Sequence, residues 1–302
     1  GRLLGESNNP TAITICYGTT DQGTNNKTAW AVNVPLGNIP VGSFSTTPTT
    51  LAPSTLYYYR CYGTNAFGDG WSGVQSFRTP GLPTVPVAIA GSLLIDLNIS
   101  RGVTTSGGNV TSWTNYGTAG GAFGSDGADP TSGTTVGQQS VVFNGGQRLK
   151  TPYNAPSQIV GQTGGVGNPY SVEAWVYSLN DVDQQAVFCW AQRGGNTAIL
   201  NYGSDGGYGA VTHWGAADMG WGAAGRPALG AWHLLTLTYD GSTEKVYADG
   251  IFKNSAAKNL NLRSDTPCIV GQAQCGLSCY VNGFAGSMAG LRVHSGTLTD
   301  AQ

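Results

Sequence analysis

The residues best suited to recognition chemistry gather in one glycine-rich segment, residues 189–221. Flat indole and phenol rings stack on the apolar faces of sugar rings, while Asn, Asp, Arg and His side chains exchange directional hydrogen bonds with hydroxyl groups. The segment therefore predicts a glycan-binding platform. Its candidate residues are Trp190, Arg193, Tyr202, His213, Trp214, Asp218 and Trp221.

An alternative is that these aromatic side chains pack inside the fold, because tryptophan is largely buried in most proteins. His213 and Trp214 are consecutive, so on one strand they point to opposite faces and only one of them belongs to a given surface. The solvent exposure of Trp190, Trp214 and Trp221 discriminates between the two interpretations.

Catalytic groups are not brought together by this sequence. Glu173 and Trp175 alternate onto one face of a predicted strand, but the segment 170–177, YSVEAWVY, contains no second acid. Glycoside hydrolysis generally uses two carboxylates about 5–9 Å apart. We therefore expect Glu173 to pair with a cation such as Arg292. No Gly-x-Ser-x-Gly elbow, no cysteine beside a histidine and no phosphate-binding P-loop occurs, so we predict a protein without catalytic activity.

Six cysteines in a chain without a Cys-x-x-Cys motif favour structural disulfides and an oxidising compartment over a zinc site. Cys275 and Cys279 lie four residues apart around a glycine and are candidates for a local bridge. Cys189 and Cys268 are a second candidate pair. Cys16 and Cys61 are the third, but strand alternation places their side chains in different layers, so this pair needs a bulge.

The elements that hold these residues are predicted to be short strands. With 47 Gly, 14 Pro and only 10% charged residues in 302, the chain reads as all-β and rich in turns. The net charge of −2 offers no attraction to polyanions, which argues against nucleic acid as a partner. No apolar run approaches the ~20 residues that a membrane-spanning helix needs.

Three segments carry a family resemblance. Residues 232–254 read as two alternating strands joined by a turn at Asp240-Gly241, a β-hairpin pattern. Together with 170–177 and FAGSMAGLRVHSG at 284–296, they resemble the laminin-G-like, concanavalin-A-type jelly roll over roughly residues 92–302. The resemblance implies a two-sheet sandwich and extracellular recognition or adhesion, often of glycans. We assign it residues 91–302. In the Gly-, Ser- and Thr-rich stretch before Gln138 we expect long loops with a turn at Gly107-Gly108, and strand signals only at VTSWTNYG (110–117) and GAFGSD (121–126).

Residues 1–80 form a separate predicted domain. LAPSTLYYYRCYGTNAFGDGW at 51–71 resembles a fibronectin type III strand, in which Tyr57 is the corner tyrosine that holds the turn through its hydroxyl. The first strand of such a sandwich is missing before Gly1. Either the chain is part of a longer protein, or a neighbouring subunit supplies the strand. The proline-rich residues 81–90 are the predicted linker.

The jelly-roll resemblance raises the question whether the chain binds calcium. The loop or strand-end acids that could serve as ligands are Asp96, Asp126, Asp129, Asp205 and Asp218. None of them forms an Asp-x-Asp run, and Asn144 and Gln147 stand where related jelly rolls carry acids. We therefore assign no metal site and no cofactor.

Three hypotheses of function follow. The first is a non-catalytic, extracellular or cell-surface recognition segment that binds a glycan or an extracellular protein through the jelly roll. The second is a structural subunit of an extracellular layer or filament, which contacts copies of itself or a neighbouring subunit. The third is an accessory region of a hydrolase whose catalytic groups lie outside these residues.

Overall fold

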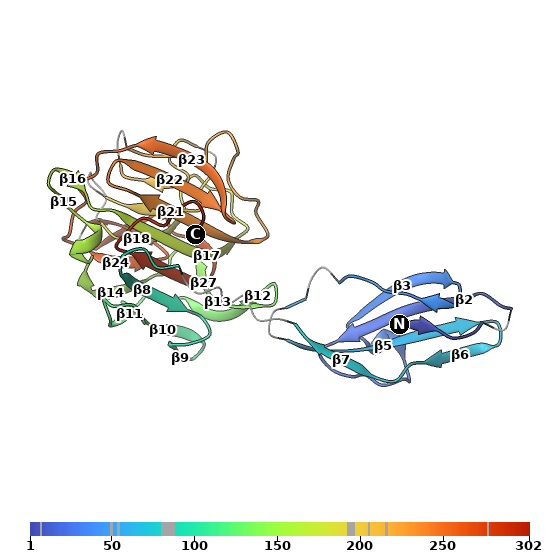
Figure 1. Cartoon of the computed structure of the whole chain (residues 1–302). Helices are drawn as coiled ribbons and strands as arrows, with labels where there is room; N and C mark the ends of the chain where they lie inside the picture. Colours follow the sequence, from blue (N-terminus) through green and yellow to red (C-terminus); the bar gives the residue numbers. More distant parts are fainter. Residues whose placement is uncertain are drawn as a thin grey trace. The chain divides into compact units, whose positions relative to one another are not determined.

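The structure is a computed structural model in which the regular secondary structure of the described residues is almost entirely strand, connected by turns and loops (Figure 1). The described residues are 1–6, 8–48, 51–52, 55–79, 88–191, 197–204, 206–214, 217–276 and 278–302. Their helices are two single turns of 3-10 helix, η1 (Lys27–Ala29) and η2 (Ser157–Ile159). The prediction of an all-β protein is confirmed.

The chain divides into two compact units, Gly1–Pro86 and Val87–Gln302, and each is described by itself. The linker that the sequence predicts over residues 81–90 falls mostly outside the described residues.

The N-terminal unit is built on one antiparallel sheet with the strand order β3-β2-β5-β6, in which β7 also pairs with β5. A separate two-stranded sheet pairs β1 with β4. The strands are β1 (Arg2–Leu3), β2 (Thr11–Gly18), β3 (Val32–Ile39), β4 (Gly42–Ser43), β5 (Leu56–Asn65), β6 (Gly68–Trp71) and β7 (Gln75–Arg78).

The core of this sheet follows from alternation. Ile13, Ile15 and Tyr17 are buried on one face of β2, as the sequence predicts. Tyr57 of β5 lies against Tyr17 and stacks on Phe77, with ring centroids 6.3 Å and 5.7 Å away. The Tyr57 hydroxyl accepts a hydrogen bond from the backbone N–H of Ala52 at 3.0 Å, so Tyr57 ties the preceding loop to the sheet.

The C-terminal unit contains the remaining strands. They are β8 (Leu93–Asn98), β9 (Val103–Ser106), β10 (Asn109–Thr114), β11 (Ala122–Gly124), β12 (Thr131–Thr135), β13 (Gln138–Asn144), β14 (Leu149–Asn154), β15 (Gln162–Thr163), β16 (Val166–Gly167), β17 (Tyr170–Ser178), β18 (Ala186–Cys189), β19 (Ile199–Asn201), β20 (Val211–Thr212), β21 (Trp232–Tyr239), β22 (Thr243–Ala248), β23 (Ile251–Ala257), β24 (Pro267–Val270), β25 (Ala273–Gly276), β26 (Cys279–Val281) and β27 (Ala285–His294).

Antiparallel pairing links most of these strands in the order β20-β19-β18-β24-β14-β11-β10-β12-β13-β27-β17-β21-β22-β23, with β8 on β27 and β9 on β10. Strands far apart in this order face each other across one core. Tyr170 of β17, for example, packs edge-on against Trp190, which directly follows β18, with ring centroids 5.2 Å apart. The sheet therefore folds over itself into the two facing layers of a jelly-roll sandwich, which agrees with the predicted fold class.

Two local predictions had different outcomes. The hairpin predicted at 232–254 is present as β21 and β22, and Asp240 caps its turn by accepting hydrogen bonds from the N–H groups of Ser242 and Thr243. In the stretch before Gln138, β10 and β11 lie at the two strand signals of the sequence, whereas β9 and β12 lie where long loops were expected. Here Gly107 and Gly108 both adopt positive φ between β9 and β10, so the predicted turn is the turn of a hairpin.

The cysteines form one disulfide, between Cys275 and Cys279, which closes the β25–β26 hairpin. The other four cysteines are free. Cys189 and Cys268 lie on adjacent strands, but Cys189 is in register with Ile269, so Cys268 points to the opposite face of the sheet. That candidate bridge is wrong for this reason. Cys16 and Cys61 also face different layers, since Cys61 is in register with Ile15.

Candidate functional site

The predicted aromatic platform is largely inside the protein. Trp190, Tyr202 and Trp221 are each 0% exposed. Trp190 is packed between Tyr170 and Phe188, with both ring centroids at 5.2 Å. The structure therefore corrects the prediction for these three residues, because their ring faces are already covered by other side chains and cannot stack on a sugar.

The remaining platform candidates are not gathered on one surface either. Trp214 is half-buried against the small apolar cluster that contains Cys189 and Ile199. Asp218 is half-buried and accepts a hydrogen bond from the backbone N–H of His213 at 2.7 Å. Arg193 lies outside the described residues.

His213 is a core residue, only 4% exposed, and belongs to a buried polar cluster. Its Nε2 atom lies 3.0 Å from Oε1 of Glu244, and its Nδ1 atom lies 2.6 Å from the carbonyl oxygen of Thr197. The Tyr170 hydroxyl donates to the same Glu244 carboxylate at 2.9 Å. These contacts satisfy polar groups that would otherwise be costly to bury, so we assign the cluster a structural role.

The charges around Glu244 determine the protonation of this cluster. Burial opposes a charged His213, but the Glu244 carboxylate beside it outweighs burial and raises the pKa of His213 above its ordinary value. Burial also raises the pKa of the Tyr170 hydroxyl, and Glu244 adds to the effect. The Lys258 ammonium donates to the carbonyl of Asp218 at 3.2 Å.

Partly exposed aromatic rings lie instead on the outer face of the layer formed by β27, β17, β21 and β22, which run side by side (Figure 1). On β17, Val172, Ala174 and Val176 point into the core, and the alternate residues Trp175 and Tyr177 point outward and are half-buried. We call the outward surface formed by Glu173, Trp175, Tyr177, Trp232, Leu234, Thr236 and Arg292 the aromatic face.

Pairing of β17 with β21 brings the three large rings of the aromatic face together. Tyr177 is in register with Trp232, and Trp175 is in register with Leu234. The Trp175 and Trp232 rings are nearly parallel, at an interplanar angle of 11° and a centroid distance of 6.2 Å, and Tyr177 lies 5.8 Å from Trp232. The Trp232 indole N–H donates to the carbonyl of Thr135 at 3.0 Å, which fixes the orientation of its ring.

Charged side chains border these rings in a second cross-strand row. Glu173 is in register with Arg292, which is in register with Asp96. The predicted pairing of Glu173 with Arg292 is wrong despite this register. The Glu173 carboxylate contacts His294 instead, at 3.1 Å from its Nε2 atom. Asp96 forms ion pairs with two arginines, at 2.6 Å to Arg101 and at 3.8 Å to Arg292.

A polar groove lies on the same outer surface beyond the aromatic face. Its residues come from β21, the β21–β22 hairpin and the C-terminal segment: Thr238, Asp240, Thr243, Lys245, Thr297, Leu298, Thr299, Asp300 and Ala301. We call it the Lys245 groove. Within it, the Lys245 ammonium donates to both oxygens of Asp300, at 2.9 Å and 3.2 Å, and the Tyr247 hydroxyl donates to the same carboxylate.

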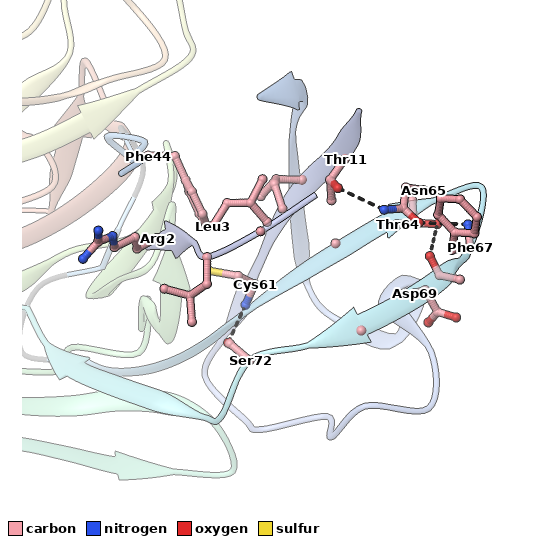
Figure 2. A pocket seen from close by; sticks show the side chains of 16 residues that line it. Arg2, Leu3, Thr11, Phe44, Cys61, Thr64, Asn65, Phe67, Asp69 and Ser72 are labelled. Carbon is pink, nitrogen blue, oxygen red and sulfur yellow. Dashed lines mark hydrogen bonds between the residues drawn. The ribbon is translucent and has the colours of Figure 1, made fainter. Parts of the chain in front are cut away.

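The N-terminal unit has an apolar groove of a different character (Figure 2). Leu3, Ile13 and Phe44 line it together with the thiol-bearing Cys61. Among its lining residues, Leu4 and Phe67 are 83% and 77% exposed. Polar side chains, among them Arg2, Asn65 and Asp69, line the same groove, so it combines apolar and polar groups.

Among the described residues, no group of three or more His, Cys, Asp and Glu side chains is placed to hold a metal ion. The acids proposed for calcium are engaged elsewhere: Asp126 pairs with Arg148 and Lys150, and Asp129 accepts from Ser125. Asp205 is outside the described residues. No helix in the described part of the chain is long and apolar enough to cross a membrane.

The chain belongs to the concanavalin A-like lectin/glucanases superfamily. The model of this family, Laminin_G_3, matches residues 143–302, more than half of the chain. The matched part contains β17, β21 and β27, which carry the aromatic face. No curated protein sequence matches the chain.

Several solved structures are similar to this chain. Domain 4 of AbnA, an extracellular GH43 arabinanase of Geobacillus stearothermophilus, solved with arabinotriose, is 17% identical with a TM-score of 0.52, over 70% of this chain and 97% of that chain. A putative carbohydrate-binding protein of Bacteroides ovatus is 12% identical with a TM-score of 0.40, over 96% and 73% of the two chains. The CBM40 domain of a Ruminococcus gnavus sialidase, bound to sialyllactose, is 11% identical with a TM-score of 0.35, over 54% and 92%.

The aromatic face was accessible to sequence reasoning only in part. Alternation in YSVEAWVY predicts that Glu173 and Trp175 share one face of a strand, opposite Val172, Ala174 and Val176. The contribution of Trp232 depends on the register between β17 and β21, which residue spacing does not specify. The tryptophans concentrated in residues 189–221 were predicted to form the binding surface, but Trp190 and Trp221 belong to the core.

Proposed function

We propose that the C-terminal unit is a non-catalytic glycan-binding domain and that the aromatic face is its binding surface. One observation carries this proposal: the half-exposed side chains of Trp175, Tyr177 and Trp232 lie together on one outer face of the sheet. Such rings cover the apolar faces of sugars, while Glu173 and Arg292 beside them offer an acceptor and donors for hydroxyl groups. The fold shared with the arabinotriose-binding domain of AbnA supports the proposal.

The proposal excludes a glycosidase role for this face. Asp96 and Glu173 share its charged row, two strands apart, and a hydrolase needs one such carboxyl group to donate a proton. Here Asp96 is paired with Arg101, and Glu173 is hydrogen-bonded to His294. Both carboxylates are thus held by neighbouring side chains, which leaves neither of them free as a proton donor at this face.

The N-terminal unit is, in this proposal, a fibronectin type III-like spacer of an extracellular or cell-surface protein. The bond from the Ala52 N–H to the Tyr57 hydroxyl supports the assignment of Tyr57 as a corner tyrosine. The extracellular arabinanase that contains the related domain supports an extracellular location.

Binding to immobilised polysaccharides tests the proposal. The protein is passed through gels that contain arabinan, xylan or β-glucan, and we expect at least one of them to retard it. Trp175→Ala and Trp232→Ala should each lose most of the retardation, whereas Phe67→Ala, an exposed aromatic in the other unit, should keep it. Circular dichroism confirms that the variants are folded. Equal retardation of Trp175→Ala and the unmodified protein would refute the role of the aromatic face.

A second candidate function is assembly into an extracellular layer or filament, and the exposed Leu4 and Phe67 at the apolar groove favour it. Apolar patches of this kind occur at protein contacts. Sedimentation velocity over a range of concentrations tests the candidate. Assembly predicts larger species that Phe67→Ser abolishes, and a single monomeric species at high concentration counts against it.

A further inference from the structure

The aromatic face and the Lys245 groove are joined by the outward residues of one strand. Along β21 these residues are Trp232, Leu234, Thr236 and Thr238. Trp232 belongs to the ring cluster and Thr238 lines the groove. The two positions are six residues apart, which corresponds to roughly 20 Å along an antiparallel strand. A ligand that contacts both ends must therefore be an extended oligosaccharide of several units.

The groove is lined with groups that suit sugar hydroxyls. Four threonines, Thr238, Thr243, Thr297 and Thr299, contribute to its wall, although Thr238 is only 4% exposed and the Thr297 hydroxyl donates to the carbonyl of Tyr239. Between them lie Lys245 and Asp300, whose side chains are 34% and 68% exposed although they are paired with each other. A carboxylate accepts hydrogen bonds from two neighbouring hydroxyl groups and an ammonium donates to their oxygens, so such a pair recognises a vicinal diol.

The groove is held in shape by bonds from the C-terminal segment to the sheet. The Ser171 hydroxyl of β17 donates to the carbonyl of Gly296 at 2.9 Å and accepts from the N–H of Leu298 at 2.8 Å. The Thr297 hydroxyl donates to the carbonyl of Tyr239 at 2.8 Å. A surface fixed in this way loses little conformational entropy when a ligand binds.

The balance of charge along the surface from the aromatic face to the Lys245 groove favours a neutral ligand. In the charged row, Asp96 and Glu173 offset Arg101 and Arg292. In the groove, Asp300 offsets Lys245, while Asp240 adds a further negative charge. A polyanionic glycan would therefore meet no surplus of positive charge, whereas hydroxyl groups meet donors and acceptors throughout.

We propose that the Lys245 groove is a second sugar subsite, and that the domain binds internal stretches of a neutral, linear glycan along β21 from the Trp175 and Trp232 rings to Lys245 and Asp300. This inference rests on the proposed function. It adds the class of ligand, a chain of several neutral units, and assigns recognition to residues beyond the ring cluster.

A size ladder of oligosaccharides tests the inference. Fragments of two to eight units are prepared by partial hydrolysis of whichever of arabinan, xylan or β-glucan retards the protein, and their affinities are measured by isothermal titration calorimetry. We expect affinity to rise tenfold or more between the shortest and the longest fragments. Asp300→Asn and Lys245→Gln should each lower the affinity for the longest fragment by about tenfold, the effect of one lost charged hydrogen bond.

The matched control is Asp265→Asn, which alters an exposed carboxylate paired with Arg263 away from the groove and should leave every affinity unchanged. Affinity that is already complete for the shortest fragment, or full affinity of both groove variants for the longest one, would overturn the second subsite while the proposed function stands. A carboxylated polysaccharide such as polygalacturonate that binds more tightly than the neutral ones would overturn the assignment of a neutral ligand. No retardation by any polysaccharide would overturn both proposals.

Discussion

At the scale of single residues, the buried Glu244 carboxylate makes the stability of the C-terminal unit depend on pH. His213 has a pKa raised above its ordinary value of 6.5, so its charged form is stabilised by folding. The stability that it contributes is fully present below pH 6.5 and is lost as the pH rises through the raised pKa. We therefore expect the free energy of unfolding to fall in this interval, measured by urea denaturation at a series of pH values.

Two variants isolate the effect. His213→Gln leaves the Glu244 carboxylate buried without a cation beside it and should cost on the order of 3 kcal/mol at pH 6. Glu244→Gln removes the charge that raises the pKa of His213. Both should flatten the pH dependence between pH 6 and pH 9. A slope as steep in both variants as in the unmodified protein would contradict the assignment.

Residue types alone placed Glu173 and Trp175 on one face of β17 but did not identify the partner of Glu173. Glu173 and Arg292 are in register on neighbouring strands, and a side-chain pairing between them was the simplest expectation. Arg292 leans instead toward Asp96 on its other side, and His294 lies within hydrogen-bonding distance of Glu173. When several ionisable groups share a sheet face, the choice of partner depends on side-chain rotamers, which a sequence does not encode in its spacing.

At the scale of elements, the predicted strands were found where alternation was clear, as in β17, β21 and β22. They were missed where glycine, serine and threonine dominate, as in β9 and β12, because an exposed strand with few apolar residues has no apolar alternation. The positions of the tryptophans were the hardest to infer. Trp190 directly follows β18, and Trp221 lies in the connection between β20 and β21. Both side chains are buried in the core, and the glycine-rich sequence around them does not predict this packing.

The β25–β26 hairpin is the element that the disulfide stabilises. A bridge that closes a loop of five residues removes roughly 2 kcal/mol of chain entropy from the unfolded state. Cys275→Ser should therefore lower the free energy of unfolding by at most about 2 kcal/mol, measured by urea denaturation of the oxidised protein. A much larger loss would mean that the hairpin supports the fold through contacts other than the bridge.

The cysteines outside this hairpin allow a prediction of the number of free thiols. Cys16, Cys61, Cys189 and Cys268 are free, so a thiol reagent should titrate four groups in the denatured, unreduced protein. In the native protein we expect Cys189 to be unreactive, because burial raises its pKa to about 11. A count of two thiols in the denatured protein would show that a second disulfide forms after all.

At the scale of the whole molecule, the two compact units suggest a division of labour. The aromatic face, the Lys245 groove and the Glu244 cluster all belong to the unit Val87–Gln302, which has its own large core. The exposed apolar groove belongs to the other unit. Recognition of glycans and contacts with other proteins would therefore be carried by separate parts of the chain, and each can be tested without the other.

Separate expression of residues 1–79 and 88–302 tests this division. Because each unit has its own buried core, we expect both pieces to fold and to melt near the temperatures of the two transitions of the intact chain. The 88–302 piece should bind the polysaccharide with the affinity of the intact chain, since all residues of the aromatic face and the Lys245 groove lie within it. If binding were lost on separation while the piece remained folded by circular dichroism, part of the glycan surface would have to come from the N-terminal unit.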